Sequence, residues 1–242
     1  MIRIALIVIR VLWILPYWLW IKVRRYKQVD KYSLEERYGF IHSIVGKVNR
    51  KGRVEVECHG LENLPEKSGY FMAPNHQGLE DPLAIFQTHE RPVRAIVKTE
   101  LTKAPIIGNV ITMLEYWPMN RDDIRGSVRI IKEASNALKN GQNVFVFPEG
   151  TRSRNKNNIL EFKGGTFKIA VNAKAPIVPI AILDSYKVFD VNSIKKTKVT
   201  ICYLPAITYE EYQGMHTNDI AKLVHDRVEA CIKEIEESRS NT

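Results

Sequence analysis

The sequence predicts an α/β domain with a central, mostly parallel β-sheet that is flanked by helices. Short apolar runs typical of buried strands alternate along the chain with segments whose apolar residues recur at helical spacing. The chain has 242 residues, of which 45% are hydrophobic, so it can bury one complete core. No internal repeat or long linker interrupts this pattern. We therefore expect one domain over residues 51–242, preceded by membrane-associated helices over residues 1–50.

The charge and the cysteine content narrow the class of protein. The net charge is +9, but no zinc-finger spacing, RNA-binding signature or long Lys/Arg run is present, so no nucleic-acid partner is expected. A basic chain of this kind suits an anionic membrane surface or an anionic substrate. The three cysteines are scattered, which argues against a disulfide framework and favours a reducing, cytosol-facing compartment.

The first predicted element is an apolar helix over residues 4–21, in which Arg10 is the only charged residue. A helix that spans a bilayer needs about 20 apolar residues, so this segment is near the limit. Pro16 would kink it, and no cleavage site of a signal peptide follows. The helix is expected either to cross the membrane or to lie flat in the headgroup region. A buried core helix is the alternative.

Basic residues mark one side of this helix and the segment that follows it. A narrow stripe is formed by residues at intervals of seven: Arg3, Arg10, Tyr17 and Arg24. Such a stripe would suit the headgroup region. Further cations follow at Arg25, Lys27 and Lys31. This excess of positive charge favours a cytoplasmic location for the domain that follows, at the cell membrane or another cytosol-facing membrane.

A second helix is predicted to begin after Ser33, which forms a capping-box pair with Glu36. Its apolar face is supplied by residues at helical spacing: Leu34, Ile41, Ile44, Val45 and Val48. After Lys51-Gly52 the pattern changes to alternation, which predicts a strand over residues 54–58.

The remaining elements alternate between strands and helices. Strands are expected at residues 70–74, 93–97, 144–147, 177–183 and 199–204. A helix with apolar residues from Ile124 to Leu138 is closed by Asn140-Gly141, and a final helix follows Asn218. The order of the strands in the sheet does not follow from this pattern.

The first motif, residues 75–81, follows the predicted strand at 70–74 and reads Asn-His-Gln-Gly-Leu-Glu-Asp. Neutral histidine is a suitable base for a hydroxyl that attacks a carbonyl group, and a carboxylate can fix its tautomer. Gly78 lets the chain turn so that Asp81 can approach His76. The alternative is structural, since Asp81-Pro82 also forms a good helix start. A zinc site lacks recognisable ligand spacing.

The second motif, residues 147–153, follows the predicted strand at 144–147 and reads Phe-Pro-Glu-Gly-Thr-Arg-Ser. Arginine binds phosphate through a planar, multidentate fork, so Arg152 is a candidate phosphate ligand and Arg121 is a second. Lys163 could add positive charge at the start of the following helix. The alternative is a turn with a Glu149–Arg152 surface ion pair. Together, the two motifs indicate acyl transfer to a phosphate-bearing acceptor.

With both motifs in view, the chain resembles the glycerolipid acyltransferase family, and within it the 1-acylglycerol-3-phosphate acyltransferases. The first motif is similar to that family's His-x-x-x-x-Asp block. A set of residues that leads to Asn120-Arg121 resembles the second block: Lys98, Glu100, Leu101, Pro105 and Gly108. Residues 147–153 resemble the third block. A proline-bearing apolar strand at residues 177–180 resembles the fourth. The resemblance covers roughly residues 53–205.

The resemblance implies an α/β acyltransferase domain in which His76 is the catalytic base and Asp81 orients it. It also implies that Arg121 and Arg152 hold the acceptor phosphate, while Glu149 positions Arg152 or the glycerol portion. The other residues expected to bind substrate are Asn75, Gly150, Thr151 and Lys163. No metal and no cofactor are expected, because acyl-CoA or acyl carrier protein enters as the acyl-donor substrate.

The implied reaction converts lysophosphatidic acid into phosphatidic acid in phospholipid biosynthesis, with the phospholipid bilayer and the lysophospholipid acceptor as partners. Three related reactions stay open: acylation of another lysophospholipid, acylation of glycerol-3-phosphate, and transacylation between phospholipids. A non-catalytic membrane protein that binds lipid is a more distant alternative. The sequence does not choose between the two types of donor.

Overall fold

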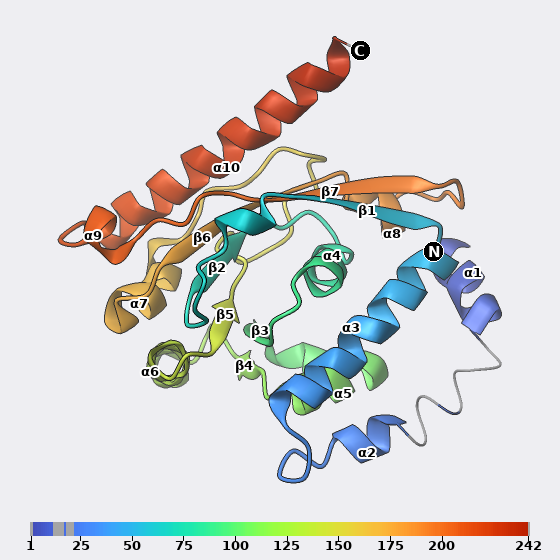
Figure 1. Ribbon diagram of the computed structural model, residues 1–242, viewed down its shortest axis with the longest axis horizontal. Helices are drawn as coiled ribbons and strands as arrows, with labels where there is room; N and C mark the ends of the chain where they lie inside the picture. The colour runs from blue at the N-terminus through green and yellow to red at the C-terminus, as the bar shows by residue number, and fades with distance from the viewer. Residues whose placement is uncertain (1, 12–16, 18–21, 242) are drawn as a thin grey trace.

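The computed structural model describes residues 2–11, 17 and 22–241. Among these residues, one sheet of seven strands runs in the order β1-β7-β6-β2-β5-β3-β4 (Figure 1). The strands are β1 (Val54–His59), β2 (Phe71–Pro74), β3 (Val93–Lys98), β4 (Trp117–Met119), β5 (Asn143–Phe145), β6 (Ile177–Leu183) and β7 (Thr197–Tyr203). Neighbouring strands are parallel except for the antiparallel pair β6–β7. The predicted α/β fold with a mostly parallel central sheet is therefore confirmed.

The single antiparallel pair determines which chain segments meet at each end of the sheet. Strands β2, β3, β4, β5 and β6 finish at the same end, where β1 and β7 begin. His76 follows β2, so we call this the His76 end of the sheet. Ligands of parallel α/β sheets bind beyond the carboxyl ends of the strands. The fold therefore directs attention to the loops at the His76 end.

Helices cover both faces of the sheet (Figure 1). One face packs against α3 (Leu34–Lys51), α4 (Asp81–Thr88) and α5 (Pro105–Met113). The other packs against α6 (Ile124–Lys139), α7 (Gly164–Ala173) and α10 (Thr217–Ser240). The short helices are α2 (Arg24–Tyr26), α8 (Tyr186–Phe189) and α9 (Tyr209–Tyr212), with 3-10 turns at Leu61–Asn63 and Thr99–Lys103. Every residue of β6 is buried, as expected for a central strand covered on both faces.

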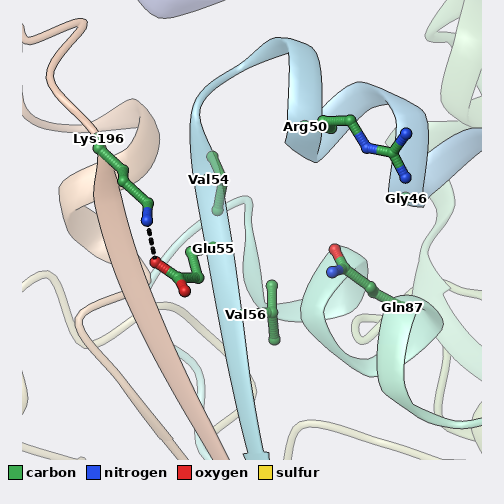
Figure 2. A pocket seen from close by; sticks show the side chains of 7 residues that line it. All are labelled: Gly46, Arg50, Val54, Glu55, Val56, Gln87 and Lys196. Carbon is green, nitrogen blue, oxygen red and sulfur yellow. Dashed lines mark ion pairs between the residues drawn. The ribbon is translucent and has the colours of Figure 1, made fainter.

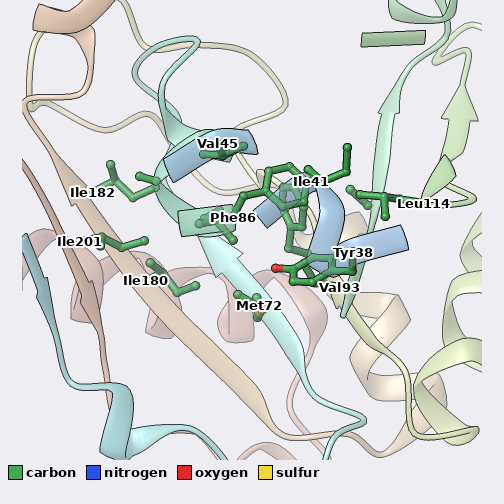
Figure 3. Close-up of a cluster of buried hydrophobic side chains, with 14 of the residues drawn as sticks. Tyr38, Ile41, Val45, Met72, Phe86, Val93, Leu114, Ile180, Ile182 and Ile201 are labelled. Carbon is green, nitrogen blue, oxygen red and sulfur yellow. The ribbon is translucent and has the colours of Figure 1, made fainter. Parts of the chain in front are cut away.

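Helix α3 is part of the main core and begins where its capping box predicts. The Ser33 hydroxyl oxygen accepts from the Glu36 backbone N–H at 3.2 Å, and the Glu36 carboxylate accepts from the Ser33 backbone N–H at 2.9 Å. Tyr38, Ile41 and Val45 pack against strand residues in the core shown in Figure 3. Residues 34–51 therefore share a core with the domain predicted to begin at residue 51.

Strand β4 is an element that the sequence analysis missed. It consists of three residues at the edge of the sheet, and Pro118 is the middle one. Proline lacks a backbone N–H, so it is confined to edge strands and does not suggest a strand in a sequence. This short strand leads directly to Asn120 and Arg121, and so it fixes the second predicted phosphate ligand at the His76 end.

The N-terminal segment is described in part. Helix α1 covers Ile2–Val11, whereas Trp13, Pro16 and the tryptophans at 18 and 20 lie outside the described residues. Among the described residues, no helix has the length and apolar character needed to cross a membrane. The prediction of a continuous helix over residues 4–21 therefore falls partly outside what the structure describes.

The first two members of the expected cationic stripe, Arg3 and Arg10, bind backbone oxygens of the protein. Arg3 is buried and donates to the backbone oxygens of Gly52 at 2.7 Å and Lys195 at 2.8 Å, and to Thr197 Oγ1 at 2.6 Å. Arg10 donates to the Lys51 carbonyl oxygen at 2.9 Å. Backbone carbonyls at the end of α3 and just before β7 need donors, and these guanidinium groups supply them.

Candidate active site

His76 and Asp81, predicted to act together, are in direct contact. His76 Nδ1 lies 2.6 Å from Asp81 Oδ2. The Asp81 carboxylate is fully buried, while the His76 side chain retains 20% of its exposure. A buried carboxylate on Nδ1 fixes the proton there and leaves Nε2 as the basic nitrogen. Nε2 makes no hydrogen bond with any part of the chain that the structure describes.

Three more donors hold the Asp81 carboxylate in place. The backbone N–H groups of Gln77 and Gly78 donate to Oδ2 at 2.6 and 2.9 Å. The hydroxyl of Ser185 donates to Oδ1 in a short hydrogen bond. The helix start expected at Asp81-Pro82 is present, although Glu80 is the N-cap and Asp81 is the first residue of α4. The preceding turn, and not the helix, therefore fixes this carboxylate.

The histidine ring is also fixed by a stacked aromatic side chain. The rings of His76 and Phe147 have centroids 4.0 Å apart and an interplanar angle of 15°. Phe147 is the first residue of the second motif, so this contact joins the two motifs. A backbone hydrogen bond of 2.9 Å from Ser153 N–H to the His76 carbonyl oxygen joins them again. Ring orientation and main-chain position of the candidate base are thus both set by the second motif.

Glu149 does not pair with Arg152. It therefore neither positions that arginine, as the resemblance implies, nor forms the surface ion pair of the structural alternative. Its Oε1 accepts from the His76 backbone N–H at 2.6 Å, and its Oε2 accepts from the Leu160 backbone N–H at 3.0 Å. Burial raises the pKa of Glu149 to about 7, against the lowering effect of these two hydrogen bonds. Buried N–H groups need acceptors, and the β2–β5 pairing brings this carboxylate to them. Glu149 therefore positions the main chain of His76.

A cluster of positive charge lies beside this pair of motifs. Gly150 follows Glu149 and has a φ of +75°, which glycine adopts without strain. A Cβ atom at this position would lie 3.2 Å from Lys163 Nζ and 3.5 Å from the guanidinium carbon of Arg121. Two of the predicted phosphate-binding cations therefore converge on Gly150, although they come from loops 42 residues apart in the sequence (163 minus 121).

The other predicted binding residues differ in how they are placed. Arg152 Nη1 lies 3.7 Å from Asp190 Oδ1, and its side chain is 27% exposed. Thr151 is exposed next to it. Asn75 is buried, and its side-chain amide bonds the Ile182 backbone in both directions, at 3.0 Å to the oxygen and 2.7 Å from the nitrogen. Its amide therefore links β2 to β6 and is not free to contact substrate.

Ser185 is the functional contact that the sequence analysis missed. It lies two residues after β6 (Ile177–Leu183), which runs parallel to β2 and ends at the same end of the sheet. A polar residue just beyond an apolar strand is a weak signal for a site. Its hydroxyl also approaches Gln77 Oε1 at 3.2 Å, so one side chain supports both the carboxylate and the turn that holds it.

An open groove elsewhere on the surface does not coincide with this site. Figure 2 shows it between α3 and β1, where Lys196 pairs with Glu55 at 2.6 Å. The side chains lining the groove are Gly46, Arg50, Val54, Glu55, Val56, Gln87 and Lys196. None of them is a predicted site residue. The candidate active site is defined by the side chains around His76.

A family model described as Acyltransferase matches residues 55–183, which is more than half of the chain. The chain belongs to the acyltransferase family. The match confirms the resemblance inferred from the motifs. The matched region of this acyltransferase contains His76, Asp81, Arg121, Glu149 and Lys163.

Similar curated proteins include three named as 1-acyl-sn-glycerol-3-phosphate acyltransferases. The chloroplastic BAT2 protein of Brassica napus is 33% identical over 57% of this chain and 40% of its own length. The Borreliella burgdorferi protein is 25% identical over 72% of this chain and 70% of its own length. The human alpha protein is 30% identical over 72% of this chain and 61% of its own length. This acyltransferase thus spans less than half of the plant relative.

The fold also matches a solved structure. The crystal structure of the 1-acyl-sn-glycerophosphate (LPA) acyltransferase PlsC from Thermotoga maritima superposes with a TM-score of 0.76. The superposition covers 96% of both chains at 23% sequence identity. At this identity the likeness establishes the fold, and its coverage extends beyond both ends of the family match.

Proposed function

We propose that this acyltransferase transfers a fatty acyl group from an acyl thioester to the free hydroxyl of 1-acylglycerol-3-phosphate, giving phosphatidic acid in phospholipid biosynthesis. The observation that carries the proposal is the His76–Asp81 pair, held beside the cations that converge on Gly150. A base for a hydroxyl and a cluster for a phosphate are what such an acceptor requires. The names of the curated relatives support the same substrate.

The proposed mechanism is direct attack by the acceptor. His76 Nε2 takes the hydroxyl proton while the acceptor oxygen bonds to the thioester carbonyl carbon. Asp81 stabilises the imidazolium that forms. The carbon–sulfur bond then breaks, and the imidazolium returns the proton to the departing thiolate. Neither motif supplies an activated serine or cysteine, so the route needs no acyl-enzyme.

Arg121, Lys163 and Arg152 are proposed to hold the acceptor phosphate. Arg121 and Lys163 converge on Gly150, whose lack of a side chain leaves room for an anion next to the main chain. Arg152 already has a carboxylate partner, Asp190, which a phosphate would replace. Glu149 and Asn75 are proposed to act through the main chain of His76 and the β2–β6 pairing, without contact to substrate.

The proposed location is a cytosol-facing membrane, with the active site on the cytoplasmic side. Helix α1 supports membrane association because it exposes four large apolar side chains: Ile2, Ile4, Val8 and Ile9. It is docked through Arg3 at the start of β1 and β7, at the same end of the sheet as His76. The donor, acyl-CoA or acyl carrier protein, would approach from the aqueous side.

The test is a matrix of acceptors and donors assayed with purified protein and with His76→Ala. Lysophosphatidic acid, a lysophospholipid with a larger headgroup and glycerol-3-phosphate are each combined with acyl-CoA and acyl carrier protein, and release of thiol is followed. We expect lysophosphatidic acid to be preferred and His76→Ala to lose at least about 10³-fold in kcat. Near-normal turnover by His76→Ala would refute the mechanism, and lipid binding without thiol release would indicate a non-catalytic protein.

A further inference from the structure

The large apolar side chains on the surface are unevenly distributed between the two ends of the sheet. Among the described residues, the exposed large aliphatic side chains lie on α1 or in segments that follow β2–β6, with the exception of Leu61. Those at the His76 end are Ile2, Ile4, Val8, Ile9, Leu79, Leu101, Ile106, Ile107, Ile124, Val128, Leu160, Val191 and Ile194. Leu61 follows β1, at the opposite end. Chance exposure of single residues would not favour one end.

The densest group outside α1 is at the start of α5. Leu101, Ile106 and Ile107 are 36%, 60% and 40% exposed, and we call these three residues the α5 patch. They follow β3, and the 3-10 turn at Thr99–Lys103 packs against α5 to present them together. Ile111 and Met113, on the same helix, are buried in the core. Helix α5 therefore buries its C-terminal half and leaves an apolar N-terminal turn without a partner in the described chain.

The α5 patch and α1 lie on opposite sides of His76. In the strand order, α1 is docked on β1 and β7 at one edge, the α5 patch follows β3 near the other edge, and His76 follows β2 between them. Both α1 and α5 lie on the face covered by α3. A planar apolar medium that touches both would thus extend across the entrance to the candidate active site.

Cations accompany the apolar groups. Lys103 is exposed immediately before α5, and Lys98 is exposed at the end of β3, where it pairs with Glu100 at 3.1 Å. Arg121 and Arg125 are exposed beyond β4, the adjacent strand. Apolar side chains bordered by lysine and arginine match the chemistry of an anionic membrane interface.

We propose that the α5 patch is a second membrane contact, which together with α1 seats the His76 end of the sheet on an anionic lipid bilayer. The proposal rests on the proposed function, because a lysolipid acceptor reaches His76 from the bilayer. With two contacts on opposite sides of the base, the membrane surface fixes the orientation of the active site. With α1 alone, the domain could rotate about a single attachment.

The test compares Ile106→Asn/Ile107→Asn with Leu61→Asn, which replaces one exposed aliphatic side chain by the same amide at the opposite end of the sheet. Sedimentation with phosphatidylglycerol–phosphatidylcholine vesicles is the assay. We expect the double variant to bind at least about tenfold more weakly and Leu61→Asn to bind as the wild type does. Equal binding by the double variant, or equal loss in Leu61→Asn, would overturn the proposal.

A second measurement covers the case in which the double variant folds poorly. Ile106→Cys, labelled with an environment-sensitive fluorophore, should show a blue shift when vesicles are added, whereas labelled Leu61→Cys should not. The unsubstituted protein, treated in the same way, gives the background from its own cysteines. The same spectrum for both labelled variants would overturn the proposal. So would self-association that requires Ile106 and Ile107 and leaves vesicle binding unchanged, because it would assign the patch to a second copy of the chain.

Activity separates this proposal from the proposed function. With a short-chain lysolipid that is monomeric in water, the double variant should turn over as the wild type does and lose activity only when the acceptor is in vesicles. His76→Ala should show the reverse behaviour, with vesicle binding intact and turnover lost for both acceptors. A double variant that loses activity towards the monomeric acceptor to the same extent would show that the patch serves the active site and not the membrane.

Discussion

At the scale of single residues, the buried Asp81 carboxylate is the group of the site whose position hydrogen bonds fix most completely. It accepts hydrogen bonds from a ring nitrogen, two backbone N–H groups and the hydroxyl of Ser185. A carboxylate with four donors has a single favourable position, and the imidazole bonded to it shares that position. The charge of Asp81 can therefore be tested separately from its geometry.

Asp81→Asn should keep the fold and lose catalysis. The asparagine oxygen can accept the two backbone N–H groups, and Ser185 can rotate to accept from the new amide, so the turn is retained. The negative charge that stabilises the imidazolium is removed, and kcat should fall by roughly 10³-fold or more. Steady-state kinetics and a melting curve measure the two effects. Asp30→Asn, in an exposed turn, is the control, and a kcat within a few-fold of wild type in Asp81→Asn would contradict the assigned role.

Glu80, next to Asp81, is a buried carboxyl that the proposed mechanism does not use. Its Oε1 accepts from Asn49 Nδ2 at 2.8 Å, while Oε2 has no partner in the described part of the chain. Burial raises the pKa of Glu80 to about 8, against the lowering effect of the Asn49 hydrogen bond. The negative charge of Asp81 raises it further. Glu80 is therefore protonated at neutral pH, which spares the site a second buried charge.

Replacement of Glu80 by glutamine should change how stability depends on pH. Between about pH 4.5 and about pH 8, the Glu80 carboxyl is protonated in the folded state and ionised in the unfolded state. In this interval the group therefore lowers the free energy of unfolding of the wild type by up to roughly 1.4 kcal/mol for each pH unit. Glu80→Gln removes that loss. Urea unfolding at about pH 5 and about pH 8 should show the variant gaining on wild type as pH rises. Parallel pH profiles would mean that Glu80 is not the group responsible.

The contacts within one motif could be predicted from the sequence, whereas those between motifs could not. His76 and Asp81 are five residues apart, so the turn at Gly78 suffices to predict their contact. Ser185 reaches Asp81 across 104 residues, and the link depends on β6 being next to β2. Glu149 has one charged neighbour in its own motif, Arg152, but its actual partner, the His76 backbone, depends on the β2–β5 register.

At the scale of secondary-structure elements, α1 contains an arginine whose place in the sequence suggests contact with a membrane surface but which binds the protein's own backbone. Arg3 makes three hydrogen bonds of 2.8 Å or shorter to the start of β1 and β7. Its guanidinium thus attaches α1 to the sheet, while four apolar side chains of the same helix are exposed: Ile2, Ile4, Val8 and Ile9. The sequence shows a cation at position 3, but only the three-dimensional structure shows the carbonyl groups it satisfies.

Arg3→Met should loosen α1. The variant leaves buried carbonyl groups without donors, which costs about 1–3 kcal/mol for such a group. Hydrogen exchange of the α1 amides should become faster, while exchange in β6 should change little. Arg10→Met is a matched control, because Arg10 makes one exposed hydrogen bond to the Lys51 carbonyl. Equal protection of α1 in Arg3→Met and wild type would show that the helix is held by other contacts.

The long, strongly patterned elements follow from the sequence, whereas β4, one of the short elements, does not. The capping box of Ser33 and Glu36 places the start of α3, and the apolar run at Ile177–Leu183 places β6. Strand β4 has three residues, and Pro118 removes one hydrogen-bond donor, so neither length nor pattern predicts it. Its place in the sheet comes from pairing with β3.

At the scale of the whole molecule, the net charge of +9 should make the proposed membrane binding depend on salt. Attraction between a basic protein and anionic lipid weakens as salt shortens the Debye length from about 10 Å at 0.1 M to about 3 Å at 1 M. Binding to phosphatidylglycerol-containing vesicles should therefore weaken as salt is added, while the part of the binding that comes from apolar contacts should persist. Vesicles of phosphatidylcholine alone should show little salt dependence. Salt-independent binding to both compositions would mean that charge contributes nothing.

The antiparallel pair β6–β7 also has a practical consequence for attaching other molecules to this protein. Because the functional loops gather at the His76 end, the turns at the opposite end are separated from them by the length of the sheet. The turn at Asn140-Gly141, between α6 and β5, is one of these, and a Cβ at Gly141 would meet nothing within 4 Å. A surface linker or a fluorescent reporter inserted there would immobilise or visualise the protein while the His76 end stays free.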